Sequence, residues 1–100
     1  MARIAIHPGE HLAEELDALE MSAAALARQL MVPTNRVTEI VNGQRAVTGD
    51  TALRLADFFG TSAEFWLNLQ SLYDLRVAEA RTGKAISKLP TLRRPEEAHV

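Results

Sequence analysis

The amino-acid sequence predicts an all-α fold of five helices. Apolar residues recur at three- and four-residue steps through about the first eighty positions, which is the period of a helix with one buried face. Residues that cap or end helices interrupt this pattern at intervals. No strand pattern of useful length and no internal repeat is present. Only Ile4 and Ile6 alternate, and so short a stretch can at most pair at the edge of a dimer.

The first helix is expected to begin near His7 or Pro8, because proline has the fixed φ that suits a first helical turn. Glu10 also interacts favourably with the helix dipole there. The apolar face is formed by three leucines at four- and three-residue steps, namely Leu12, Leu16 and Leu19. The opposite face is acidic and carries Glu10, Glu14, Glu15 and Asp17.

Two short helices are expected next. Ser22 is a good N-cap for the first of them. The apolar side of this helix comprises Leu26, Ala27, Leu30 and Met31. Pro33 biases Val32 away from helical geometry, so it ends this helix and starts the next, which runs to about Asn42. Gly43 is the expected left-handed C-cap. The inward side chains of this third helix are Val37, Ile40 and Val41.

A fourth helix is expected between Thr48, its N-cap, and Gly60, which closes it. Its inward residues are Ala52, Leu53, Leu55, Ala56 and Phe59. The fifth and longest helix opens at a capping box of Thr61 and Glu64 and is expected to run to about Arg81, before Gly83 stops it.

The apolar residues of the fifth helix cover more surface than one neighbouring layer needs. Part of this surface is therefore expected to contact a second subunit and to form a homodimer. The residues assigned to this interface are Phe65, Trp66, Leu69, Leu72 and Tyr73. We divide the chain into a folded domain of residues 1–82 and a flexible, basic tail of residues 83–100.

The composition is that of one globular domain. The chain has 100 residues, of which 47% are hydrophobic and 24% charged, which is enough for a single core. The absence of cysteine excludes disulfides and thiolate metal sites and fits a reducing cytoplasm. No apolar run approaches the roughly 18 residues that cross a bilayer, and MARIAIHPGE lacks the apolar region of a secretory signal. We expect a cytoplasmic protein without a membrane partner.

Charge is distributed unevenly along the chain. The net charge of −2 is unusual for a protein that binds nucleic acid. However, residues 28–45 carry three arginines against one glutamate, and residues 76–94 carry six basic residues against one acidic residue. The chain is thus divided into an acidic start and two basic stretches, the first of which covers the short third helix.

The two short helices and the tight turn between them have the spacing of a DNA-reading helix-turn-helix, in which the second helix enters the major groove. Asn35 and Arg36 are the best candidates for base contacts, because asparagine pairs with adenine and arginine with guanine. The candidates for backbone contacts are Thr34, Gln44 and Arg45, at a helix end or in the adjoining loop. Thr38 and Glu39 complete the outward set and are also assigned to the contacts with DNA. The pattern leaves open a generic helical bundle whose third helix is merely solvated.

Three segments of the sequence resemble a known family. LARQLMVPTNRVTEIVNGQR resembles the helix-turn-helix of xenobiotic-response-element and lambda-repressor-like regulators. HPGEHL and VNGQRAVTGDTALRLADFFGTSAEFWLNLQSLYDL resemble, more narrowly, the HigA/VapI antitoxins of type II toxin–antitoxin systems, over about residues 6–78. The resemblance implies a homodimeric, five-helix DNA-binding domain that represses its own promoter. It also implies that the protein neutralises a HigB-type toxin, an mRNA-cleaving ribonuclease of the RelE-like fold.

The sequence departs from related regulators at Ala23, where they often have a glutamine, so Arg28 or Gln29 is expected to contribute the DNA contact instead. Glu39 repels phosphate unless it accepts from a cytosine amino group or orients Arg36. The acidic face of the first helix is the candidate surface for a basic toxin. Its residues are Glu10, Glu14, Glu15 and Asp17.

Residues 7–11 match the H-x-x-E-H pattern of zinc proteases, but Pro8 and Gly9 place His7 at or outside the helix cap. We therefore predict no metal site and no cofactor. No serine has a histidine nearby in a catalytic arrangement, and we predict no enzyme activity. Two alternatives to an antitoxin stay open, namely a solitary helix-turn-helix transcriptional regulator and a protein-interaction module that has lost DNA binding.

Overall fold

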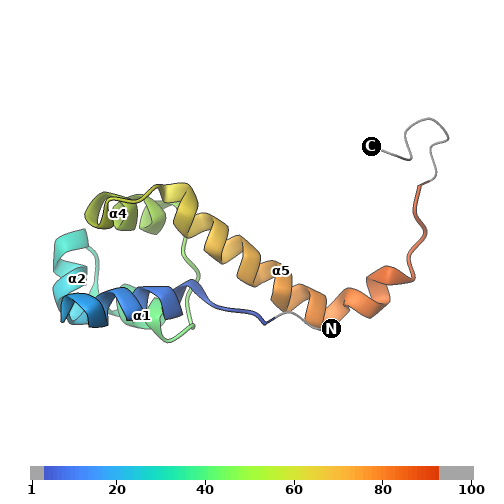
Figure 1. Ribbon diagram of the computed structural model, residues 1–100, viewed down its shortest axis with the longest axis horizontal. Helices are drawn as coiled ribbons and strands as arrows, with labels where there is room; N and C mark the ends of the chain where they lie inside the picture. Colours follow the sequence, from blue (N-terminus) through green and yellow to red (C-terminus); the bar gives the residue numbers. More distant parts are fainter. Residues whose placement is uncertain (1–3, 93–100) are drawn as a thin grey trace.

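The computed structural model describes residues 4–92 and contains five α-helices and no β-strand within that range (Figure 1). The helices are α1 (Pro8–Leu19), α2 (Ala23–Leu30), α3 (Thr34–Val41), α4 (Gly49–Phe59) and α5 (Ala63–Ser87). The predicted all-α class and the order of the five helices are confirmed. Of the predicted tail, residues 93–100 lie outside the described part of the chain.

The first four helices form a compact body that packs against the N-terminal half of α5, while the rest of α5 extends away from it (Figure 1). α4 lies against α5, α2 against α3, and α1 against both α3 and α5. Trp66 of α5 is the largest fully buried side chain, and its Nε1 donates a hydrogen bond to Oγ1 of Thr61 at 2.9 Å. The core comprises Leu12, Leu16, Leu26, Ala27, Leu30, Val37, Ile40, Val47, Ala52, Leu55 and Trp66.

The first turn of α1 lies unusually close to α3. Nδ1 of His7 accepts a hydrogen bond from the N–H of Gly9 at 2.9 Å, so the buried His7 is the N-cap of α1, as predicted. A Cβ atom on Gly9 would lie 1.8 Å from the carbonyl oxygen of Ile40. Only glycine therefore permits this approach of α1 to α3. The ring of His7 also meets the edge of Tyr73 on α5, with centroids 4.8 Å apart.

The predicted start of α5 is wrong by one residue. Oγ of Ser62, not of Thr61, accepts from the backbone N–H of Phe65 at 3.1 Å and caps the helix. The hydroxyl oxygen of Thr61 instead accepts the hydrogen bond from Nε1 of Trp66.

The predicted end of α5 is also wrong. The helix continues past Arg81 and through Gly83 to Ser87. A glycine inside an exposed helix costs only about 1 kcal/mol relative to alanine. No atom outside the helix lies close to Gly83, so nothing in the packing ends the helix there.

Three apolar side chains predicted to face inward are exposed, namely Leu19, Met31 and Leu53. Leu19 is the last residue of α1, where the helix leaves the core. Met31 is the C-cap of α2 in the left-handed conformation, with φ of 58°, which directs its side chain to solvent. Leu53 lies about 100° around α4 from Ala52, outside the buried face.

Candidate nucleic-acid interface

Residues 23–41 form two short helices joined by a tight turn. Val37 and Ile40, each 1% exposed, fix α3 to the core, and the small Ala27 lies where α2 crosses α3. The N–H of Val32 donates to the carbonyl oxygen of Ala27 at 3.0 Å and closes the turn. Buried apolar contacts thus hold one side of α3, and the polar residues of the helix lie on the other.

The polar side of α3 begins with Thr34 and Asn35, which are both exposed. Pro33 precedes them and supplies no side-chain cap, so no capping side chain competes with a phosphate for the first backbone N–H groups of α3. The hydroxyl of Thr38 lies within hydrogen-bonding distance of the carbonyl oxygens of Thr34 and Asn35, at 3.4 and 3.3 Å, and so is directed at the helix backbone.

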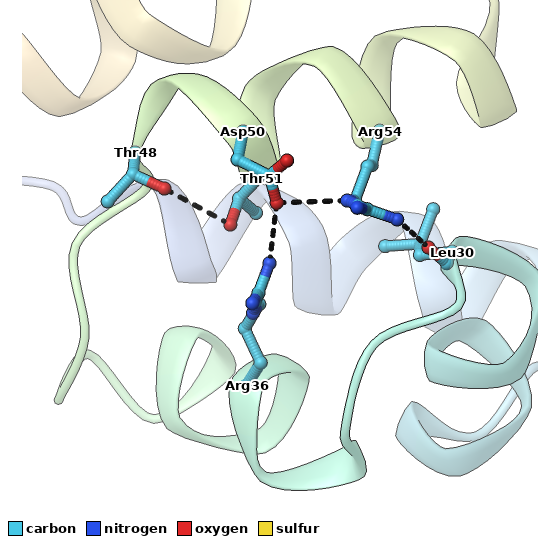
Figure 2. Close-up of polar contacts among 6 residues, drawn as sticks. All are labelled: Leu30, Arg36, Thr48, Asp50, Thr51 and Arg54. Atoms are coloured by element: carbon cyan, nitrogen blue, oxygen red, sulfur yellow. Dashed lines mark hydrogen bonds and ion pairs between the residues drawn. The ribbon is translucent and has the colours of Figure 1, made fainter.

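Arg36 is joined to α4 by an ion pair that the sequence did not reveal (Figure 2). Its Nη1 donates to Oδ2 of Asp50 at 2.7 Å. The same oxygen accepts from Nε of Arg54 at 2.9 Å, and Nη1 of Arg54 donates to the carbonyl oxygen of Leu30 at 2.8 Å. The hydrogen bonds from Arg54 and Arg36 hold the pKa of Asp50 below its usual value. Asp50 therefore joins α3 to α4, and Arg54 of α4 joins the same carboxylate to the backbone of α2.

Glu39 pairs with Arg45 in the loop that follows α3. Oε1 of Glu39 lies 2.8 Å from Nε and 2.7 Å from Nη2 of Arg45. The suggestion that Glu39 orients Arg36 is therefore wrong, since Asp50 takes that place. The predicted loop residue Gln44 is exposed beside this pair.

The loop between α3 and α4 is fastened to α5. Oε1 of the buried Gln70 accepts from the backbone N–H of Val47 at 2.8 Å, and Nε2 of Gln70 donates to Oδ1 of Asp74 at 2.9 Å. Sequence reasoning missed Gln70, although a polar residue within an apolar helical stripe is a signal for such a role.

The predicted DNA contacts on α2 lie near its C-terminal end, and one of them borders α4. Arg28 and Gln29 are both exposed near the end of α2. Gln29 lines a shallow groove of about 560 Å³ between α2 and α4, together with Leu53 and Asp57. The structure therefore places Gln29 beside α4, and its contact with DNA stays a prediction.

The residues assigned to the dimer interface divide into two groups. Trp66 belongs to the core and offers no surface, so its assignment to the interface is wrong. Phe65 and Leu72 are exposed, and Leu69 and Tyr73 are partly buried. Three of these residues, Leu69, Leu72 and Tyr73, line an apolar cleft of about 170 Å³ together with Ile4 and Ile6.

The acidic residues of α1 are also divided. Glu10, Glu14 and Asp17 are exposed and fall on one helical face, because they are four and three residues apart. Glu15 lies about 100° away from Glu14 around the helix. It instead pairs with His11, with the Nε2 and Oε1 atoms 3.5 Å apart.

α3 is a short helix that packs against α2 and α1 on its apolar side and carries polar side chains on the other side, with Arg36 and Arg45 close by. This arrangement defines a helix-turn-helix domain of the DNA-binding class. Residues 12–66 match the protein-family model described as Helix-turn-helix. The chain therefore belongs to the helix-turn-helix family, in the group that includes the HigA antitoxins. No helix within residues 4–92 has the length and apolar character needed to cross a membrane.

Three similar proteins illustrate this membership. Virulence-associated protein I of Dichelobacter nodosus is 55% identical over 76 residues, covering 75% of this chain and 70% of that protein. An addiction module antidote protein of the HigA family from Coxiella burnetii is 58% identical, with a TM-score of 0.87 over 93% of this chain and 100% of that one. The structure of Pseudomonas aeruginosa antitoxin HigA with the higBA promoter is 47% identical, with a TM-score of 0.86 over 90% and 100% of the chains.

Proposed function

We propose that this protein is the DNA-binding antitoxin of a type II toxin–antitoxin system. It acts as a homodimer that binds an inverted-repeat operator, represses its own operon and neutralises a HigB-type toxin that cleaves mRNA. It works in the cytoplasm, by binding and without catalysis. The observation that carries this proposal is the braced α3 with Asn35 and Arg36 on its polar side, in a chain 47% identical to an antitoxin whose structure holds promoter DNA.

In this proposal α3 enters the major groove. Asn35 and Arg36 contact bases, and Thr34, Gln44 and Arg45 contact the phosphate backbone. Arg28 and Gln29 add contacts from α2. Thr38 and Glu39 shape the polar side of α3 through their bonds within the protein.

The apolar cleft of Ile4, Ile6, Leu69, Leu72 and Tyr73 supports a homodimer through α5. Such a dimer recognises half-sites about one helical turn, or about 34 Å, apart. Footprinting on the DNA upstream of the gene should show two related half-sites. Protection of one isolated half-site would contradict the dimer.

Binding to the operator and binding to the toxin can be tested separately on the purified protein. The purified protein should shift a duplex of its own upstream DNA, with an affinity that falls steeply with salt. It should also co-purify with the product of the adjacent small gene and abolish mRNA cleavage by that product. Operator binding without a toxin would make the protein a solitary regulator, and toxin binding without operator binding would make it an interaction module.

The toxin surface is proposed to be the exposed acidic face of α1, formed by Glu10, Glu14 and Asp17, with Glu15 beside it. A basic toxin would be attracted to this face by complementary charge. Lysine substitutions at Glu10, Glu14 and Asp17 should weaken toxin neutralisation and its dependence on salt while operator binding persists. Unchanged neutralisation would rule this surface out.

A further inference from the structure

A short chain of hydrogen bonds through Asp50 and Arg54 connects the three helices around the recognition surface. Oδ2 of Asp50, in the first turn of α4, accepts from Arg36 of α3 at 2.7 Å and from Arg54 at 2.9 Å (Figure 2). Arg54 in turn donates to the carbonyl oxygen of Leu30, the last residue of α2, at 2.8 Å. Arg54 therefore holds the carboxylate from one side, and the carboxylate presents a fixed acceptor to Arg36.

A fixed acceptor matters because a guanidinium group must lie in the correct plane to donate both of its hydrogen bonds to a base. Arginine recognises guanine with two parallel N–H donors, so the plane and direction of the group must both fit. Arg36 has five N–H donors, and the bond to Asp50 uses its Nη1. The bond thus restricts the rotamers of Arg36 and leaves its other nitrogens to donate elsewhere.

We infer that Asp50 is a positioning residue for sequence recognition, which fixes the direction of the Arg36 guanidinium and thereby narrows the set of operator sequences that the protein accepts. This inference rests on the proposed function, since Arg36 has a base to read only if α3 enters the major groove. Asp50 has two opposite effects on DNA. Its negative charge weakens binding to every phosphate backbone, and its hydrogen bond strengthens discrimination between bases.

The test compares the affinity for a labelled duplex of the upstream DNA with the affinity for a scrambled duplex of equal length. Asp50→Asn removes the charge and keeps the shape. We expect the ratio of the two affinities to fall about tenfold, while the affinity for the scrambled duplex rises. Asp50→Glu, which retains a charged acceptor, should recover at least half of the lost ratio on a logarithmic scale. A purely structural role would lower both affinities together.

Asp57→Asn is the matched control. Asp57 lies on the same helix and, like Asp50, lines the groove between α2 and α4, and it makes no ion pair within residues 4–92. This variant loses the same charge and should keep the wild-type ratio. The position of the effect on the operator is a second readout. Single-base substitutions should show that Asp50→Asn and Arg36→Ala relax the preference at the same base pair.

The double variant Arg36→Ala, Asp50→Asn should discriminate no worse than Arg36→Ala alone, because Asp50 acts through Arg36. An unchanged ratio in Asp50→Asn, or losses that add in the double variant, would overturn the inference while the proposed function stands. A wild-type protein that binds both duplexes equally would instead remove the proposed function, and the inference with it.

Discussion

Glu39 of α3 holds Arg45 of the following loop through a single carboxylate oxygen, Oε1, which lies within 2.8 Å of two guanidinium nitrogens. Arg45, the basic residue of this loop, is therefore already paired in the absence of DNA. A phosphate has to compete with this carboxylate for Arg45. The pair is partly exposed, so solvent weakens it and the exchange costs little.

Glu39→Gln should therefore increase binding to DNA of any sequence. The variant frees Arg45 and removes a negative charge beside the phosphates, so we expect about fivefold tighter binding to a scrambled duplex at low salt. The slope of log affinity against log salt should steepen by about one unit. Fluorescence anisotropy at several salt concentrations measures both. Glu79→Gln, which frees Arg76 on α5, should leave the slope unchanged.

Arg36→Ala should weaken binding to the operator by about 1–3 kcal/mol and relax the preference at one base pair. The reason is that arginine supplies the two donors that distinguish guanine from other bases. Binding to a panel of operators with single-base substitutions measures the effect. Equal operator affinity for the variant and the wild type would remove Arg36 from the set of base contacts.

The stability of the fold should depend on the protonation of His7. Burial lowers the pKa of His7 below the usual 6.5. A hydrogen bond with the backbone of Arg45 and the negative charges of Asp74 and Glu10 raise this pKa by smaller amounts. The neutral ring is the form that accepts from the N–H of Gly9. As the pH falls through 6.5, the unfolded chain binds a proton before the folded chain does, so stability is lost. The loss ends below the lowered pKa of the folded state.

Urea unfolding between pH 7.5 and 5 tests this dependence. Asn is a good N-cap without a proton to gain, so His7→Asn should flatten the dependence over this range. A variant with the same pH profile as the wild type would show that another group is responsible.

Met31→Gly should stabilise the protein by about 1 kcal/mol, because glycine adopts positive φ without the steric cost that other residues incur. The Met31 side chain is 85% exposed, so little packing is lost. Chemical unfolding measures the difference. Met31→Ala keeps the left-handed strain and serves as control. Glu20, with φ of 52°, is an independent second position for the same substitution.

Leu72→Glu should dissociate the dimer, since it places a charge in the apolar cleft between α5 and the N-terminal segment. Sedimentation velocity should show a monomer, with weaker operator binding because two half-sites no longer bind together. Leu53→Glu introduces the same charge at an exposed position on α4 and should leave the dimer intact. If the Leu72→Glu protein remained a dimer, this face of α5 would be excluded as the dimer interface.

Short-range signals in the sequence predicted most of the fold. Ser22 and Gly60 lie at helix ends in the structure, because caps are determined by the residue itself and its immediate backbone. Thr61 and Ser62 are neighbours with the same chemistry, and pattern alone selected the wrong one. The end of α5 was missed because glycine weakens a helix without ending it.

The pairs of side chains that bond between helices could not be predicted from the sequence. Asp50 and Arg36 are 14 positions apart, and they meet only because α3 and α4 both pack against α2. Gln70 and Val47 are 23 positions apart and are joined for the same reason. The outward residues of α3 followed from its helical period, whereas the partners that fix those residues depend on how the helices pack.

The hydrogen bond between Gln70 and Val47 also ties α5 to the loop that follows α3. Gln70 lies on α5, the helix proposed to join two subunits, and Val47 lies in the loop that carries Arg45. In a dimer formed through α5, the angle between the two copies of α5 would therefore set the distance between the two copies of α3. A single residue inserted into α5 after Gln70 would turn the partner by about 100°. The two copies of α3 would then no longer fit successive grooves on one side of the duplex.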